Sequence, residues 1–279
     1  MDIATPATTR EDALARRYGG ADAAPAAGPW NDTIALMLNH RSVRGYRPDA
    51  LPEGTLQTLL AAAQSAATSS NLQCWSVVAV RDPAKKAELA RLAGNQKHID
   101  QCPLFLVWLA DPSRNARLAD AANTTLAGLE FFESFLVSAI DAALAAQNAV
   151  LAAQSLGMGT VYIGALRNRP DEVAALLDLP PGCAAVFGLC VGYPAAGAEG
   201  EVKPRLPQPV VCHEERYDAA NEPALRAGYD QRMADFSKRN EMAQATWSER
   251  VIGRLGTMKA LNGRDRLFGL LRQLGFPLK

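Results

Sequence analysis

The most unusual group of polar side chains in this chain lies at residues 40–46, which read HRSVRGY. Within five positions this segment places His40, Arg41, Ser42 and Arg44. Such basic groups repel one another unless an anion lies among them, and arginine forks with a hydroxyl are typical ligands of phosphate. A solvated helix end is the alternative, because basic side chains complement the negative end of a helix dipole. The segment by itself leaves both interpretations open.

Three further polar segments interrupt apolar surroundings, namely TSSNLQ at 68–73, NQKH at 95–98 and KPR at 203–205. Lys203 and Arg205 offer a point charge and a bidentate fork to a phosphate. Gln96 carries a donor and an acceptor on one amide, which suits the edge of a ring system. Each segment alone is also compatible with a turn or a helix end.

The composition restricts the class of protein. The 279 residues are 48% apolar, and 29 basic side chains balance 29 acidic ones, so we expect no nucleic-acid or membrane-surface partner. Five cysteines without metal-ligand or paired spacing predict a reduced, cytoplasmic protein with no structural zinc. The sequence shows no HExxH motif and no Ser/His/Asp order, so we expect neither a metal nor a side-chain nucleophile. The N-terminus has no apolar signal region.

Apolar patterning predicts helices and strands in one α+β domain. The expected strands are WSVVAV, PLFLVWLA, GTVYIGAL and AAVFGLCVGYP, which predict a central mixed sheet of about four or five strands flanked by helices. The fully apolar run PLFLVWLA predicts a strand that is covered on both faces. The stretch GMGTVYIGA lacks the G-x-G-x-x-G spacing, which argues against a Rossmann fold.

The longest periodic segment covers residues 126–159 and is apolar almost all round. As one helix it would be on the order of 45 Å long, more than one small core needs. Glu130, Glu133 and Asp141 interrupt it, so it lacks an uninterrupted membrane span of about 20 apolar residues. We therefore expect a long apolar core helix at a homodimer interface.

Composition changes along the chain predict three blocks. Residues 1–29 are expected to be a flexible tail with a possible short helix at REDALARRY, and residues 30–212 the core. Residues 213–279 are charged and helical in pattern, which indicates an extension.

Taken in order, HRSVRGY, ATSSNLQCWSVV, GNQKHI, VYIGALRN, VFGLCVGYP and KPRLP resemble the FMN-dependent nitroreductase family, within it the NADPH-preferring flavin reductase and oxygen-insensitive nitroreductase branch. The resemblance begins near residue 31 and implies a nitroreductase-like fold. It also implies an FMN-dependent NAD(P)H oxidoreductase that uses NADPH or NADH and a small aromatic or quinone-like acceptor. Hydride transfer through flavin N5 would be ping-pong, since one open ring face serves both ligands. The chain's extension at 213–279 would embrace the partner subunit.

The resemblance implies roles for particular residues. Residues that match the first FMN-binding segment are His40, Arg41, Ser42 and Arg44, with Arg44 turned toward the ring as an electrostatic stabiliser. Those on the phosphate side are Lys203 and Arg205, and those that reach the cofactor from the second subunit are Thr68, Ser69 and Asn71. Gln96 matches a residue at the ring edge. The strand whose backbone N–H groups face N5 and O4 is matched by Tyr162, Ile163, Gly164 and Ala165.

Two departures from the family pattern affect these expectations. Ala165 stands where close relatives carry Gly, and its methyl group would narrow the pocket. Arg239 and Arg264 are expected to contact NAD(P)H, and Arg239 matches an arginine that reads the 2′-phosphate. The segment EMAQA supplies no cation where relatives are arginine-rich, which weakens the expected preference for NADPH.

Two other functions are compatible with the same motifs. The first is a non-catalytic sensor module that binds FMN or another phosphorylated ligand. The second is a flavin-consuming or dehalogenating relative of the same superfamily, although the sequence shows no clear lid insertion of the kind those relatives carry.

Overall fold

The computed structural model describes residues 9–26 and 28–279. The chain divides into two compact units, each built from two separated stretches. Unit 1 comprises residues 1–41 and 200–260, and unit 2 comprises residues 42–199 and 261–279. The two units are not continuous in the chain, so they do not test the three predicted blocks. The division into residues 1–29, 30–212 and 213–279 therefore stays a prediction.

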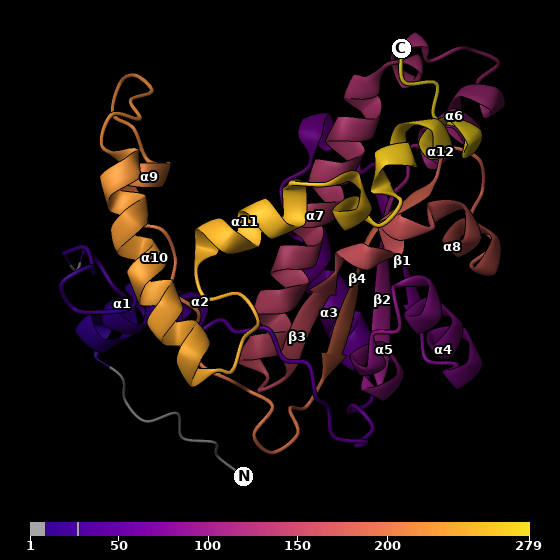
Figure 1. Cartoon of the computed structure of the whole chain (residues 1–279). Helices are drawn as coiled ribbons and strands as arrows, with labels where there is room; N and C mark the ends of the chain where they lie inside the picture. Colours follow the sequence, from indigo (N-terminus) through magenta and orange to yellow (C-terminus); the bar gives the residue numbers. More distant parts are fainter. Residues whose placement is uncertain (1–8, 27) are drawn as a thin grey trace. The chain divides into compact units, whose positions relative to one another are not determined.

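Unit 2 is built on a four-stranded sheet with the strand order β1-β2-β4-β3 (Figure 1). The strands are β1 (Trp75–Val80), β2 (Leu104–Ala110), β3 (Gly159–Ile163) and β4 (Ala184–Gly192). All four predicted strands are present, and the α+β class is confirmed. The sheet is antiparallel and not mixed as expected, because apolar patterning carries no information on strand direction. A parallel contact occurs at the isolated bridge between Ser42 and Thr160.

Strand β2 contributes alternate side chains to two separate cores. Phe105 and Val107 pack into the core that contains Leu89 of α4, and Leu106 and Trp108 face the core formed with α3 and α7. Every residue of β2 is buried, so the predicted strand covered on both faces is confirmed. The helices of this unit are α3 (Thr55–Gln64), α4 (Pro83–Leu92), α5 (Lys97–Gln101), α6 (Ser113–Ala121), α7 (Phe132–Ser155), α8 (Pro170–Leu176) and α12 (Leu267–Gln273). Its short 3₁₀ helices are η1 (Ser69–Asn71), η2 (Ala127–Glu130), η3 (Gly164–Asn168) and η5 (Arg264–Arg266).

Helix α7 is the long apolar helix, but its 24 residues are fewer than predicted. The extended backbone of Phe131 separates it from η2, and Gly157, with φ +75°, follows its C-terminal end. By length and composition alone α7 could cross a membrane, yet a core helix of a soluble protein meets the same criteria. The face of α7 that carries Ala145 and Ala149 is buried against the sheet.

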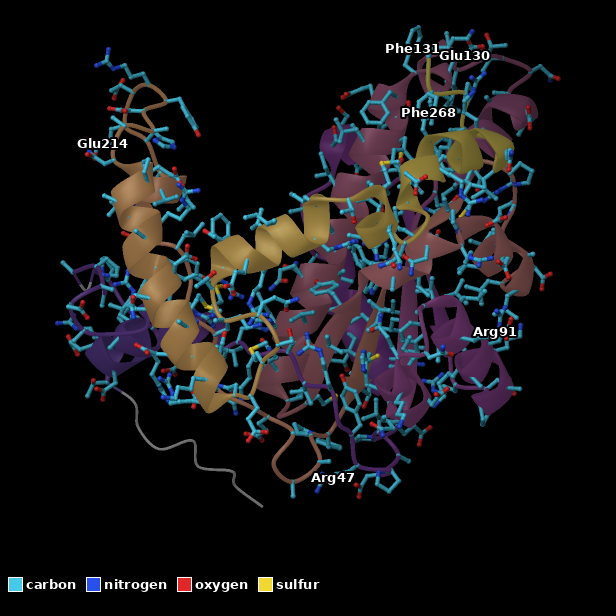
Figure 2. All side chains as sticks on the ribbon, viewed as in Figure 1. Arg47, Arg91, Glu130, Phe131, Glu214 and Phe268 are labelled. Carbon is cyan, nitrogen blue, oxygen red and sulfur yellow. The ribbon has the colours of Figure 1, made fainter. Side chains whose placement is uncertain are left out.

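The opposite face of α7 carries an apolar stripe that unit 2 does not cover. Leu136, Ile140 and Leu144 follow one another at intervals of four residues and are 41%, 49% and 44% exposed. Phe131 and Phe268, which are labelled in Figure 2, are also more than half exposed. Large exposed apolar patches of this kind mark interaction surfaces.

Unit 1 is helical, and its elements are α1 (Arg10–Tyr18), α2 (Asp32–Leu38), α9 (Gln208–Val211), α10 (Glu222–Arg239) and α11 (Trp247–Leu255), with η4 (Met258–Leu261) at its boundary. Asn31 caps the N-terminus of α2, since its Oδ1 accepts a hydrogen bond from the Ile34 N–H at 2.9 Å. The short helix expected at REDALARRY is also present as α1. Tyr229, Met233 and Phe236 of α10 form a small core of their own.

Gly188 of β4 leaves room for the ring of Phe105 in the core that also contains Leu89. A Cβ atom at this position would overlap the ring of Phe105, which is fully buried. We expect Gly188→Ala to lower the free energy of unfolding by about 1–3 kcal/mol, because a packed core accommodates added volume poorly. Urea denaturation followed by circular dichroism measures this change.

The matched control is Gly269→Ala in α12, where no described atom lies within 4 Å of the added methyl group. This control should leave stability unchanged or raise it by up to about 1 kcal/mol through helix propensity. Equal stability of the two variants would show that the contact between Gly188 and Phe105 does not limit packing.

Candidate functional site

Val43 fixes the second half of HRSVRGY to strand β3. Its N–H donates to the Thr160 carbonyl at 3.0 Å, and its side chain is only 3% exposed. Gly159 makes room for it, because a Cβ there would lie 2.6 Å from Val43 Cγ2. Successive side chains of an extended segment point to opposite sides, and the neighbours Ser42 and Arg44 are both exposed.

Arg44 lies close enough to His98 of the NQKH segment for its charge to act on that side chain. Burial, followed by the charge of Arg44, lowers the pKa of His98 below its ordinary value of 6.5. Within the described residues, the Arg44 guanidinium makes no hydrogen bond or ion pair, so it is accessible to a ligand. Gln96 donates from Nε2 to the Ala93 carbonyl at 3.0 Å, and this bond orients its amide.

The TSSN segment is held by a buried carboxylate that sequence reasoning did not single out as a site residue. Asp141 of α7 is 2% exposed and accepts hydrogen bonds from the Thr68 hydroxyl at 2.5 Å and the Ser69 N–H at 3.1 Å. The Thr68 hydroxyl is therefore engaged inside the protein, whereas the side chains of Ser69 and Asn71 are exposed. Asn71 has φ +55°, a left-handed conformation that asparagine tolerates better than most residues. An acidic residue in an otherwise apolar helix is the signal that could have identified Asp141.

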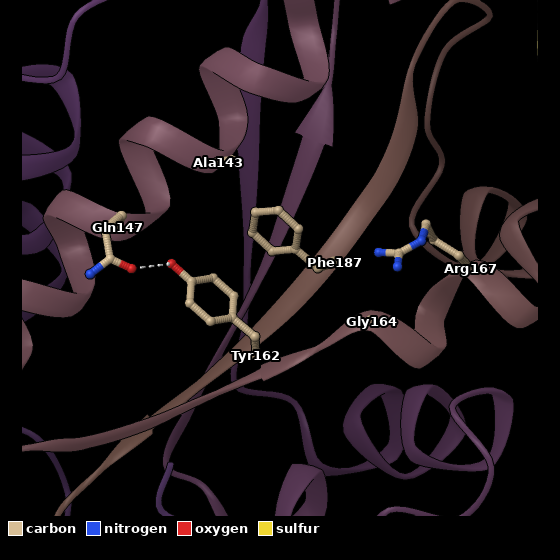
Figure 3. Close-up of a pocket in the computed structure, with 6 residues that line it drawn as sticks. All are labelled: Ala143, Gln147, Tyr162, Gly164, Arg167 and Phe187. Carbon is tan, nitrogen blue, oxygen red and sulfur yellow. Dashed lines mark hydrogen bonds between the residues drawn. The ribbon is translucent and has the colours of Figure 1, made fainter. Parts of the chain in front are cut away.

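A cavity of about 410 Å³ opens beside β3 in unit 2 (Figure 3). The residues that line it are Ala143, Gln147, Tyr162, Gly164, Arg167 and Phe187. Tyr162 and Phe187 meet edge to face with ring centroids 5.1 Å apart, and the Tyr162 hydroxyl donates to Gln147 Oε1 at 3.3 Å. Two aromatic rings with polar groups at either end suit a small planar ligand.

The segment Tyr162–Ala165 contributes to this cavity unequally. Gly164 lines it, and Ile163 is buried in the core at 1% exposure. Ala165 is 8% exposed, belongs to the same core cluster and does not line the cavity. Arg167 lines the cavity although sequence reasoning gave it no role, and its guanidinium donates to the Val186 carbonyl.

In unit 1 the two phosphate-type segments lie side by side. The guanidinium of Arg17 donates both to the His40 carbonyl and to the Lys203 carbonyl. The HR segment (His40 and Arg41) and the KPR segment (203–205) therefore lie next to each other. Arg41 donates to Asn39 Oδ1 at 3.2 Å, and Lys203 Nζ lies 5.9 Å from the centroid of the Phe236 ring. Within the described residues, the Arg205 guanidinium donates to two backbone carbonyls, each at the long distance of 3.4 Å.

The two arginines expected to contact NAD(P)H belong to different units. Arg239 of unit 1 forms an exposed ion pair with Glu201, with Nη2 at 3.2 Å from Oε2. Arg264 of unit 2 donates from Nε to Asn168 Oδ1 at 2.8 Å. Sequence reasoning identified these arginines but not their acceptors.

An antiparallel sheet covered on both faces, together with clustered basic segments, defines an α+β protein suited to a phosphorylated ligand. The chain belongs to the nitroreductase family, as its motifs indicate. The model described as "Nitroreductase family" matches residues 37–193, and the one described as "Nitroreductase family, C-terminal domain" matches residues 203–279.

Individual relatives agree with this assignment. The chain is 40% identical over 227 residues to FMN reductase (NADPH) of Bacillus subtilis, which covers 80% of this chain and 90% of that protein. It is 38% identical over 221 residues to the oxygen-insensitive NADPH nitroreductase of Salmonella typhimurium, which covers 78% of this chain and 89% of the relative. The solved structure of B. megaterium NfrA2 has a TM-score of 0.83 at 39% identity, and it covers 90% of this chain and 100% of its own.

The lowered pKa of His98 predicts how stability depends on pH. In the unfolded chain His98 takes up a proton near pH 6.5, whereas in the folded protein it takes up a proton only at a lower pH. As the pH falls, the unfolded state is therefore protonated first and is favoured. This contribution to stability is complete above about pH 6.5 and is lost below it. His98→Gln, which removes the titrating group, should therefore lose less in melting temperature than the wild type between about pH 7.5 and 5.5. The same loss in both proteins would show that His98 does not contribute.

Proposed function

We propose that this chain is an FMN-dependent NAD(P)H oxidoreductase of the flavin reductase and nitroreductase type. The observation that carries the proposal is the pairing of the HR and KPR segments through one guanidinium, in a chain 40% identical to an FMN reductase (NADPH). A phosphorylated cofactor explains why four basic side chains gather in these two segments.

The donor groups fit the phosphate of FMN. The fork of Arg205 meets only long contacts to carbonyls of its own segment, within the described residues, and a phosphate would offer it shorter, charge-assisted bonds. We assign the phosphate to His40, Arg41, Lys203 and Arg205. Ser42, which follows Arg41 in the chain, has an exposed side chain.

When bound, FMN supplies the hydride transfer between the nicotinamide and the acceptor. The chain's residues bind and orient the ring. Gly164, the first residue of η3, lines the cavity beside β3, and its N–H has no acceptor inside that helix, so we assign this N–H to the ring edge. Gln96 presents its amide to the ring edge, and Arg44 supplies a fixed positive charge that stabilises negative charge on the ring.

The cavity of Figure 3 is the proposed site for the electron acceptor. Tyr162 and Phe187 provide apolar ring surfaces, and Gln147 and Arg167 provide polar groups that can bond to nitro or quinone oxygens. A small aromatic or quinone-like acceptor matches this lining better than an aliphatic or strongly charged one.

We further propose a cytoplasmic homodimer. The uncovered stripe Leu136, Ile140 and Leu144 of α7 provides an apolar surface for a second copy. In the dimer, Thr68, Ser69 and Asn71 would contribute to the cofactor site of the partner, and residues 213–279 would embrace that partner. Sedimentation velocity measures the oligomeric state, and a flavin-loaded monomer at micromolar concentration would contradict the dimer.

The proposed function predicts a redox-active yellow protein. Purified protein loaded with FMN should lose its visible flavin absorbance when NADPH is added without oxygen, and recover it when a nitroaromatic or a quinone follows. A protein that binds flavin but is not bleached would instead be the sensor module. Consumption of the flavin itself, or halide release from a halogenated substrate, would favour the flavin-consuming or dehalogenating alternative.

The ion pair between Arg239 and Glu201 predicts how the nicotinamide is selected. NADPH differs from NADH by a 2′-phosphate, and an exposed guanidinium holds such a group with about 1–2 kcal/mol, which gives roughly a five- to thirtyfold preference. Arg239→Ala should raise the Michaelis constant for NADPH by that factor and leave NADH nearly unchanged.

Glu201→Gln is the matched control, because it removes the competing carboxylate and keeps the arginine. This variant should lower the Michaelis constant for NADPH by about two- to fivefold, the value of an exposed ion pair. Equal effects on NADH and NADPH in either variant would show that Arg239 is structural.

A further inference from the structure

Helix α1 precedes the residues that the family models match, yet it is a packed part of unit 1. Thr9 caps its N-terminus by accepting a hydrogen bond from the Asp12 N–H at 3.1 Å. Gly19, with φ +81°, closes its C-terminus by donating to the Ala15 carbonyl. Ala13 and Arg17, one turn apart on the same face, are only 7% and 6% exposed.

Arg17 uses its buried guanidinium to bond three backbone carbonyls. Nη2 donates to the carbonyls of Leu38 and His40, each at 2.7 Å, and Nη1 donates to that of Lys203 at 3.0 Å. The Arg17 carbonyl in turn accepts the Arg205 N–H at 2.9 Å. One residue of α1 therefore fastens both basic segments through their backbones and leaves their side chains to other partners.

The KPR segment is also held from the other side of unit 1. The Tyr229 hydroxyl of α10 donates to the Pro204 carbonyl at 2.9 Å. Gly19 lies directly against Pro204, since a Cβ at that glycine would come within 3.2 Å of the proline ring. The backbone of 203–205 is thus fixed between α1 and α10, and Arg17 supplies the bonds from α1.

The three carbonyls matter because of their charge. Leu38 is the last residue of α2, so its carbonyl belongs to the negative end of the helix dipole. Without Arg17, these oxygens would place partial negative charge beside the arginines and lysine that are proposed to bind a phosphate. Burial, followed by the charge of Arg205, lowers the pKa of Arg17 to about 10, so Arg17 stays protonated at neutral pH and adds to the positive potential.

We propose that Arg17 is a positioning residue for the cofactor phosphate: it neutralises the carbonyls of Leu38, His40 and Lys203 and holds the HR and KPR segments in register. This inference rests on the proposed function, since it takes FMN as the ligand. Arg17 lies outside residues 37–193 and 203–279, which the family models match. A segment outside the matched residues would then determine how tightly the phosphate is held.

The test compares FMN with riboflavin, which is the same flavin without the phosphate. Flavin-free full-length protein is titrated with each, and the change in flavin fluorescence yields the two dissociation constants. Arg17→Met should weaken FMN binding by about tenfold to a hundredfold, because bonds from a charged donor are lost and the carbonyls are left unpaired. Riboflavin binding should change by less than about threefold, since it lacks the group that Arg17 positions.

Two further variants sharpen the comparison. Arg16→Met removes a positive charge from the preceding position of α1, which is exposed. This variant should bind FMN like the wild type. Arg17→Lys keeps the charge but lacks the planar fork that reaches three carbonyls, so its loss of FMN affinity should be intermediate. Circular dichroism and thermal unfolding verify that each variant is folded, and Arg17→Lys carries the test if Arg17→Met does not fold.

The outcomes separate this inference from the function on which it rests. Wild-type protein that binds neither flavin would contradict the proposed function itself. Wild-type protein that binds FMN, with Arg17 variants that bind it equally well, would overturn the role of Arg17 alone. Equal losses for FMN and riboflavin would also overturn it, because they would indicate general loosening of unit 1. A loss specific to FMN, absent in Arg16→Met, supports the inference.

Discussion

Strand β2 is buried along its whole length, and this burial determines the arrangement of unit 2. Side chains on both faces of a strand that never meets water need apolar partners on both sides of the sheet. Helices α3 and α7 supply them on one face, and α4, α5 and α8 supply them on the other. Antiparallel pairing with β1 and β4 satisfies the backbone groups of β2 in its own plane. The sheet is therefore a rigid platform for the residues at its edge.

Strand β3 lies at one edge of the sheet, and this position explains how the segment with Ser42 and Arg44 is held. An edge strand has backbone groups that its own sheet leaves unpaired, and one of them, the Thr160 carbonyl, accepts the Val43 N–H. The segment that carries Ser42 and Arg44 is thereby fixed to the platform. At the end of the same strand the chain turns into η3, whose first residue, Gly164, lines the cavity. The edge strand thus anchors the segment that carries Ser42 and Arg44 and leads into the lining of the cavity.

Unit 1 combines a small apolar core with a cluster of basic side chains. A chain of zero net charge gathers His40, Arg41, Lys203 and Arg205 into adjacent segments, while Glu201 pairs with Arg239. Clustered cations destabilise a fold unless carbonyls, carboxylates or a ligand compensate them. Arg17 adds a further cation, and its guanidinium donates hydrogen bonds to backbone carbonyls. Under the function proposed above, the phosphate of the cofactor would supply such a compensating charge.

The sequence alone determined the class, the four strands, the short helix at REDALARRY and the motifs that belong to the family. These features depend on local patterns, such as the continuous apolar run of β2 and the order of the HRSVRGY and KPRLP segments. Only the tertiary structure decided the strand directions, the start of the long helix at Phe132 and not near residue 126, and the partners of the polar groups. Asp141 binds Thr68, which is 73 residues away, and Arg17 bonds Lys203, which is 186 residues away. Such contacts leave no periodicity in the sequence, because they arise when separate elements pack together and each buried polar group takes the nearest available partner.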